Sequence, residues 1–277
     1  IHLNRFYKRK GALDPKKLLK TTDVSTKVRA MQGPVAKRAN EAFTYLQSPV
    51  EPTTCECITK PYYEHCPTFS HFHPDVPEYS IFRVSGLGKR ILKKMVSERK
   101  FEIKDLPDGI RLKDRGKHQV LMVKEGKPII KNGEIKRVLD SLQFPLYFLD
   151  YETTTSGLPL FDGCRPYTNM PFQYSVHVLE EPGGELKHYE FLARQDTEHP
   201  VAELTDELAK VIGPKGNVVV WFKNFEMGCN DLMADMHPPA AEFLKGVNER
   251  VFDLMEVFSK FHYLHPEFKG SASIKNV

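Results

Sequence analysis

The stretch that most restricts the fold of this chain is the apolar run PLYFLDYETTT at residues 145–155. Apolar residues on both faces are typical of a central strand that is covered on both sides, so the run predicts a buried strand. Two acids, Asp150 and Glu152, stand at its end. Because an unpaired carboxylate is costly to bury, we expect a feature at this point that favours negative charge.

The residues after this run predict a mixed sheet. FQYSVHVLE (172–180) alternates apolar and polar residues as a strand does, and LKHYEFLA (186–193) follows the turn EEPGGE as its hairpin partner. A helix is predicted from Pro200 to the Gly213-Pro214 pair, and NVVVWF (217–222) reads as another buried strand. Helices are predicted over 225–236 and after Asp253. This order indicates an α/β fold, a mixed sheet flanked by helices.

The first half of the chain is basic and the second half acidic. Residues 1–144 hold 29 Lys/Arg against 16 Asp/Glu, and residues 145–277 hold 11 against 20. A basic half suits a polyanion such as nucleic acid, although a plain solvated surface explains it equally well. An acidic half suits divalent cations.

The basic half is predicted to be mostly helical. A helix is expected to begin with Pro34 at its first position and to run to Leu46, and a second amphipathic helix is expected from Ser80. Residues 104–142 read as a turn-rich connector with one short strand and a final helix.

Composition indicates an ordinary soluble protein. No apolar run reaches the roughly 18 residues of a membrane span. Five cysteines without regular disulfide spacing, and no signal peptide, indicate the reducing cytoplasm. The chain starts at Ile1 and stops just after a helical pattern, so we expect it to be a fragment.

The acids at the end of the first strand predict a metal site. Residues two apart in a strand project from the same face, so Asp150 and Glu152 are expected side by side. Such oxygen ligands suit Mg²⁺ or Mn²⁺, and a pair of these ions is one arrangement that hydrolyses phosphodiesters. The alternative is an exposed strand end that tolerates acids. A second D-x-E, Asp196 and Glu198, lies in a polar loop.

Two further acids are candidates. Glu226 is predicted in the first turn of a helix that directly follows a buried strand, which places it near the first strand's end; the alternative is an acid that favours the helix dipole. Asp253 resembles a helix N-cap and is expected to be structural.

A cysteine-rich loop, CECITKPYYEHC, carries Cys55, Cys57 and Cys66, with His71 and His73 nearby. These residue types can hold Zn²⁺, although zinc ribbons favour shorter paired spacings. Unligated thiols are the alternative.

The run D-x-E-T (Asp150, Glu152, Thr153) and the predicted strand order resemble the DnaQ-like, DEDD-type 3′–5′ exonucleases of the ribonuclease-H-like fold. The phrases FLDYET, GCRPYTNMPFQYSVH, FKNFE and KGSASIK resemble an uncharacterised bacterial family that joins such a domain to a RecB-like nuclease module. The resemblance implies the C-terminal part of a RecB-like module at 1–75, a helical connector at 76–142 and an exonuclease domain, truncated at its C-terminus, at 143–277.

The resemblance also implies roles for individual residues. Asp150, Glu152 and Glu226 would be catalytic metal ligands, with Thr153, Arg165 and Tyr167 gripping the 3′ end of a single-stranded DNA or RNA; plain loop or core roles remain open for these three. Phe222 replaces the second motif's usual Asn, and Glu226 its usual Asp. The third motif would lie beyond Val277, so this fragment can be inactive even where the complete protein cleaves.

The same resemblance implies an iron–sulfur cluster at the cysteine loop, with a histidine in place of one cysteine, or a remnant that holds Zn²⁺. The candidate ligands are Cys55, Cys57, Cys66 and His71. The leading prediction is a divalent-metal-dependent exonuclease. The alternative is a catalytically inactive nucleic-acid-binding or assembly module of the same fold. The sequence leaves DNA versus RNA, and the oligomeric state, open.

Overall fold

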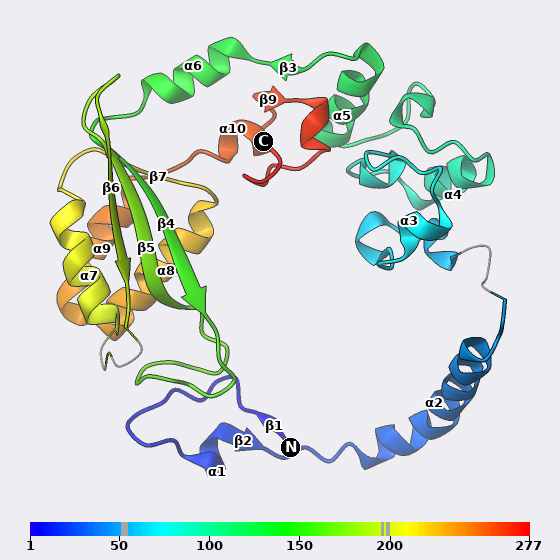
Figure 1. Cartoon of the computed structure of the whole chain (residues 1–277), viewed down its shortest axis with the longest axis horizontal. Coiled ribbons are helices and arrows are strands. Elements are labelled where there is room, and N and C mark those ends of the chain that lie inside the picture. The colour runs from blue at the N-terminus through cyan, green and yellow to red at the C-terminus, as the bar shows by residue number, and fades with distance from the viewer. Residues whose placement is uncertain (51–54, 195–196, 198–199) are drawn as a thin grey trace. The chain divides into compact units, whose positions relative to one another are not determined.

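The computed structural model describes residues 1–50, 55–194, 197 and 200–277. The chain divides into two compact units (Figure 1). Unit 1 comprises Ile1–Asp23 and Arg137–Glu256, and unit 2 comprises Val24–Lys136 and Val257–Val277. These compact units do not follow the domain boundaries expected near residues 75 and 142, and the family assignment of those segments stays a prediction.

Unit 1 is built around a five-stranded mixed sheet in the order β6-β5-β4-β7-β8. The strands are β4 (Leu146–Thr154), β5 (Met170–Leu179), β6 (Leu186–Leu192), β7 (Asn217–Val220) and β8 (Val251–Asp253). β4, β5 and β6 are antiparallel neighbours, whereas β4, β7 and β8 are parallel. The predicted mixed α/β sheet is therefore confirmed.

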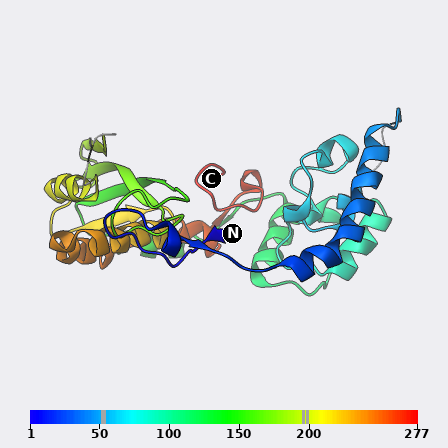
Figure 2. The ribbon, with the colours of Figure 1, turned by 90° about the horizontal axis from the view of Figure 1, so that it is seen from below.

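Three helices of unit 1 share one core with the sheet. They are α7 (Pro200–Val211), α8 (Lys223–Met236) and α9 (Ala241–Asn248), which follows the short 3₁₀ helix η5 (Pro238–Ala240). The green strands lie over the yellow and orange helices in Figure 2. Alternate residues of the strands, such as Leu149 on β4 and Val176 on β5, pack with Leu204 of α7 and Met233 of α8. The other face of the sheet therefore carries the residues in between, including both acids of β4.

The first residues of the chain belong to unit 1. They form β1 (His2–Leu3), α1 (Pro15–Leu18) and β2 (Leu19–Lys20), and the two strands pair with each other. Tyr7 and Leu18 are buried. The backbone of Arg9 pairs with Gly163 and Cys164, so this segment supports the loop that follows β4.

Unit 2 has its own core, in which Ile81, Met95 and Ile103 are almost fully buried; the long helix α2 (Ser25–Leu46) contributes no buried residue to it. Its other helices are α3 (Phe69–Phe72), α4 (Lys89–Ser97) and α5 (Asp114–Glu125), with 3₁₀ turns η1 (Glu56–Thr59), η2 (Tyr62–Glu64), η3 (Ile81–Arg83), η4 (Ile103–Asp105) and η6 (Pro266–Phe268). β3 (Ile129–Ile130) pairs with β9 (Tyr263–Leu264). The chain passes between the units just before α2, after Asp23, and again within α6 (Asn132–Asp140) and α10 (Glu256–Ser259).

Several helix predictions for unit 2 were wrong. Pro34 lies inside α2 and does not open it, because the good helix formers from Lys27 onwards extend the helix upstream. The helix expected from Ser80 is instead η3 followed by α4, because Gly86 adopts a φ of +76° and interrupts the helix. None of the described helices is long and apolar enough to cross a bilayer.

The helix expected after Asp253 is present, but it is shorter than its apolar pattern predicts. Asp253 ends the strand β8, and only the single turn α10 follows it. The pattern of apolar residues predicted neither β8 nor α9.

Candidate functional site: a carboxylate group at the end of β4

Asp150 and Glu152 project from the same face of β4. Tyr151 between them is buried in the helix-covered core, whereas both acids are exposed. Across the sheet they stand opposite Ser175 and Gln173 of β5. The prediction that the two carboxylates share a face is therefore confirmed.

No positive side chain neutralises these two acids. Neither Asp150 nor Glu152 forms an ion pair with a Lys, Arg or His in the part of the chain that the structure describes. Partial burial raises the pKa of the Asp150 carboxyl above its ordinary value, and the negative charge of Glu152 raises it further. The pair therefore carries an unbalanced negative charge.

The parallel pairing of β4 with β7 stops before the acids. The last paired residues are Phe148 on β4 and Val219 on β7. β4 continues to Thr154, so Asp150 and Glu152 lie beyond the carboxyl end of this parallel pair. In open α/β sheets this is where ligands bind.

Glu226 reaches the end of β4 from the first turn of α8. The turn into α8 is unusual because Phe222 adopts the left-handed conformation, with φ +77°. Asp253 stabilises the turn by accepting hydrogen bonds from the N–H groups of Phe222 (3.0 Å), Lys223 (3.1 Å) and Met255 (3.1 Å). Asp253 thus has the structural role expected of it, although it stands at the end of β8 and holds the start of a different helix.

A buried polar ladder fixes α8 against β4. Tyr151 Oη donates to Asn230 Oδ1 at 2.8 Å, and Asn230 Nδ2 donates to Asn248 Oδ1 at 2.7 Å. Asn248 in turn donates to Asp231 at 2.9 Å. Glu226 lies one turn before Asn230 on the same side of α8. The ladder therefore also fixes which residues of β4 Glu226 lies beside.

Glu226 is buried, with 2% of its surface exposed. The Oε2 atom of its carboxylate is buried and has no hydrogen-bond partner among the described residues. Burial, followed by the negative charge of Asp150, raises the pKa of Glu226 to about 8; Glu152 adds a smaller contribution. A buried acid without a positive partner is costly, and such groups are frequent at functional sites.

The three acids influence one another without meeting at a point. Their ligand atoms do not all lie within 4.8 Å of one another, a spacing that only the cysteines described below satisfy among the described residues. The arrangement offers hard oxygen donors around an open edge of the sheet, which is the donor chemistry of Mg²⁺ or Mn²⁺.

The other predicted contact residues lie at the same end of β4 but are less constrained. Thr153 follows a register shift in the β4–β5 pairing. Arg165 and Tyr167 are exposed on the loop after β4, and Tyr167, with φ +61°, donates its N–H to Ser156. No hydrogen bond or ion pair links the side chains of these three residues to the carboxylates.

The sequence did not predict that Arg9 holds the loop after β4. The guanidinium of Arg9 donates to the backbone oxygens of Pro159 (3.1 Å) and Leu160, and it lies 3.5 Å from Asp162. Asp162 also accepts the N–H of Gly11. Contacts across 150 residues have no local sequence signal, so no motif search finds them.

A histidine pair on the same sheet face was also missed. His177 of β5 and His188 of β6 stack with ring centroids 4.3 Å apart, and Ser175 Oγ lies 3.0 Å from His188 Nε2. The alternation in LKHYEFL places His188 and Glu190 on one face and was sufficient to predict this side of β6. Asp196 and Glu198, the second D-x-E, lie outside the described residues.

A second candidate metal centre lies in unit 2. The Sγ atoms of Cys55, Cys57 and Cys66 all lie within 4.8 Å of one another, and those of Cys55 and Cys66 are 3.3 Å apart. The thiols are free. Three close sulfur donors can bind a metal such as Zn²⁺. His71 is not part of this group, and His73 points its Nε2 at the backbone oxygen of Cys55 (3.0 Å).

Two of the thiols, Cys55 and Cys66, differ in acidity. Hydrogen bonds with Thr68, and then with Cys55, lower the pKa of Cys66 to about 7. The pKa of Cys55 is raised to about 11, first by the neighbouring side chain of Cys57. Of these two thiols, Cys66 therefore becomes a thiolate more readily, and the thiolate is the form that binds metals.

The fold and this site define a mixed α/β protein with a carboxylate group at the end of its central strand. A family described as "Domain of unknown function (DUF2779)" matches residues 147–273, a range that contains Asp150, Glu152 and Glu226. Neither the curated proteins nor the solved structures contain a match to the chain.

Proposed function

We propose that unit 1 hydrolyses phosphodiester bonds of nucleic acid with the help of hard divalent cations. The observation that carries the proposal is Glu226, a buried acid with an unpartnered oxygen beside two acids that lack ion pairs. Divalent cations bound at the carboxyl end of β4 would offset the negative charge of these acids. No described side chain does so.

The donor set fits the proposed cofactor. Asp150 and Glu152 offer exposed carboxylates, and Glu226 offers the unpartnered Oε2. Mg²⁺ and Mn²⁺ prefer such oxygen ligands and keep several waters, whereas Zn²⁺ favours nitrogen and sulfur. When bound, such ions stabilise the charge that develops on the attacking and leaving oxygens of a phosphodiester.

Each candidate site residue then has a defined role. Asp150 and Glu152 would hold the ions at the open edge, and Glu226 would release its proton as it joins them. Arg165, exposed on the loop after β4, would contact a phosphate by charge, and Tyr167 would stack on a base. Thr153 would donate a hydrogen bond to the strand end.

The finer proposal is a DnaQ-like 3′–5′ exonuclease that acts on single-stranded ends. The sheet order β6-β5-β4-β7-β8, with only β5 running against both its neighbours, supports it because this is the arrangement that the resemblance to the ribonuclease-H-like fold implies. The D-x-E pair on the central strand, with a third acid from the following helix, supports it as well.

The test uses the complete gene product with Mn²⁺ and an end-labelled single strand. We expect mononucleotides to be released by the wild type and not by Asp150→Asn or Glu152→Gln. Glu190→Gln is the matched control, because Glu190 is an exposed acid on the same sheet face two strands away. Calorimetry should show Mn²⁺ binding that both site variants weaken. Cleavage that persists in Asp150→Asn would contradict the proposed site.

One observation favours a second function, an inactive nucleic-acid-binding or assembly module. The ligand atoms of the three acids do not all lie within 4.8 Å of one another, as ligands of a single ion do. In that case oligonucleotide binds without cleavage, and Mn²⁺ binding is as weak in the wild type as in Asp150→Asn.

A further inference from the structure

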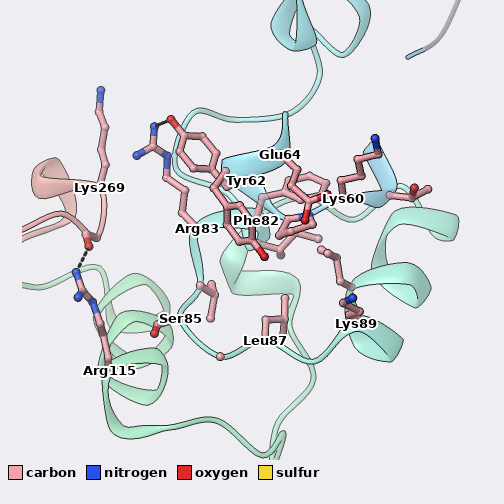
Figure 3. A pocket seen from close by; sticks show the side chains of 18 of the residues that line it. Lys60, Tyr62, Glu64, Phe82, Arg83, Ser85, Leu87, Lys89, Arg115 and Lys269 are labelled. Atoms are coloured by element: carbon pink, nitrogen blue, oxygen red, sulfur yellow. Dashed lines mark hydrogen bonds between the residues drawn. The ribbon is translucent and has the colours of Figure 1, made fainter. Parts of the chain in front are cut away.

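Unit 2 contains a cavity of about 750 Å³ that the carboxylate site does not use. Its walls come from η1 and η2, from η3, α4 and the segment between them, from one residue of α5, and from residues 269–271 of the C-terminal segment (Figure 3). Every lining residue belongs to unit 2. The shape of the cavity therefore depends on this unit alone.

The charged residues that line the cavity are mostly basic. Its basic lining residues are Lys60, Arg83, Lys89, Lys93, Arg115 and Lys269, against one lining acid, Glu64. Lys60, Lys89 and Lys93 form no ion pair within the described ranges, whereas Lys269 pairs with Glu78 at 2.5 Å. Unit 2 as a whole holds 24 Lys/Arg and 14 Asp/Glu, a net charge of +10, and unit 1 has −6. The cavity thus suits an anion.

Aromatic rings stand among these charges. The guanidinium of Arg83 lies over the ring of Tyr62, 4.0 Å from its centroid, and donates a hydrogen bond to its hydroxyl. Its Nε is buried without a hydrogen-bond partner among the described residues. Tyr63 is 83% exposed although it is a large ring. Exposed aromatic rings between basic side chains are typical of sites where unpaired bases stack.

The floor of the cavity is held in place by hydrogen bonds. Gln119 accepts the N–H of Ser85 at 2.8 Å and donates to the backbone oxygen of Arg83 at 3.1 Å. Arg115 donates to the backbone oxygen of Gly270 at 2.6 Å. A side chain at Gly270 would come within 2.3 Å of Gln119 Nε2, so the close approach of the C-terminal segment requires glycine. The cavity is therefore formed before any ligand arrives.

We propose that this cavity binds a segment of single-stranded nucleic acid. Lys89 and Lys93, one turn apart on α4, contact its phosphates, and Tyr63 stacks on a base. The guanidinium charge of Arg83 attracts a further phosphate. The proposal does not depend on hydrolysis by unit 1, since it concerns other residues and needs no divalent cation.

The experiment measures binding of a fluorescent single-stranded oligonucleotide to the complete gene product in EDTA, where no cleavage occurs. We expect Lys89→Ala/Lys93→Ala to weaken binding about tenfold or more and to reduce the slope of log K against log salt by roughly 1.4, the value for two lost phosphate contacts on a single strand. Tyr63→Ala should weaken binding roughly tenfold, through the lost stacking.

The matched control is Arg90→Ala/Lys94→Ala. These residues are exposed on the same helix at the same spacing and carry the same charge, but they do not line the cavity. This double variant should bind nearly as well as the wild type. Glu190→Gln should also bind normally, because Glu190 is exposed and lies outside both the cavity and the carboxylate site. Binding in EDTA, without cleavage, separates this proposal from the hydrolytic one.

Three outcomes would overturn the proposal. Equal weakening by the two double variants shows that the oligonucleotide responds only to net charge. An unchanged affinity in Tyr63→Ala shows that no base stacks there. Duplex DNA and heparin should compete less well than the unlabelled single strand at equal charge concentration. If either competes equally well, unpaired bases are not recognised.

Discussion

Glu226 combines two features that oppose its ionisation, burial and the nearby charges of Asp150 and Glu152. Its pKa is about 8 in the folded protein and 4.5 as an ordinary glutamate. Between these values the folded state keeps a proton that the unfolded chain has released. The stability that this group contributes is therefore present in full below about pH 4.5 and is lost as the pH rises through 8.

Glu226→Gln should remove this dependence. In EDTA at pH 9 we expect the variant to have a free energy of unfolding higher than the wild type by on the order of 2 kcal/mol, since each pKa unit is about 1.4 kcal/mol and the buried amide offsets part of the gain. At pH 4.5 the gain should disappear. Urea unfolding at both pH values measures it. Glu190→Gln should show no such trend, and a pH-independent difference for Glu226→Gln contradicts the raised pKa.

The cysteine group makes a prediction about metal content. Purified wild-type protein should retain one equivalent of zinc, and Cys66→Ser should lose most of it, because the pKa of Cys66 is lowered to about 7 and its thiolate forms readily. Elemental analysis measures the zinc, and visible absorbance would identify an iron–sulfur cluster in its place. Cys164→Ser is the control, since Cys164 is outside the group. Equal metal content in the wild type and Cys66→Ser rules out Cys66 as a ligand.

At the scale of single residues, the sequence predicts the position of a side chain when the residues around it are close in the chain. Asp150 and Glu152 share a face because residues two apart on a strand always do. The unpartnered oxygen of Glu226 and the exposure of Tyr63 were not predictable, because each depends on segments distant in sequence. Cys55, Cys57 and Cys66 were predictable as a group, but the exclusion of His71 was not.

At the scale of elements, the contact between β4 and α8 places Glu226. Tyr151→Phe removes one hydroxyl and leaves the Oδ1 of Asn230 without its donor. We expect a loss of about 1–3 kcal/mol in the free energy of unfolding, the cost of a buried unsatisfied polar group. Tyr189→Phe on β6 is the control, because Tyr189 is 42% exposed and its hydroxyl has no hydrogen bond among the described residues.

Chemical denaturation measures the stability of both variants. If unit 1 is the proposed nuclease, a shift of α8 should also lower the cleavage rate of Tyr151→Phe more than its remaining folded fraction explains. If Tyr151→Phe is as stable as Tyr189→Phe, the ladder does not hold the helix.

The sequence predicted the helices and strands that are long enough for their apolar residues to repeat with a clear period. β5 alternates over ten residues and α7 repeats its apolar residues over twelve, so each pattern is readable without its neighbours. β8 has three residues, and its place at the sheet edge follows from parallel pairing with β7, about 30 residues earlier. Such a short strand has no period of its own. From Ser80 the apolar residues have helical spacing, but the turn at Gly86 interrupts the helix that this spacing predicts.

At the scale of the whole molecule, each unit is assembled from two separate stretches of chain. Local patterns predict elements but not which distant stretch joins which unit. The assignment of Ile1–Asp23 to unit 1 depends on contacts such as that of Arg9 with the loop after β4, and the assignment of the last residues to unit 2 depends on the pairing of β3 with β9.

Arg9→Ala tests the first of these assignments. The guanidinium binds the backbone oxygens of Pro159 and Leu160 and lies beside Asp162, so its removal should free the loop at the carboxylate site. We expect a loss of about 1–3 kcal/mol in the stability of unit 1, together with faster amide hydrogen exchange over residues 155–169.

Lys10→Ala is the control, because Lys10 is exposed and makes no ion pair with a described residue. Exchange in the core of unit 2, for example at Ile103, should be unchanged in Arg9→Ala, since the contacts that are lost belong to unit 1. Slowed or unchanged exchange over 155–169 in Arg9→Ala would mean that the loop keeps its structure without the N-terminal segment. Faster exchange confined to that loop supports a site whose walls come from residues 150 positions apart.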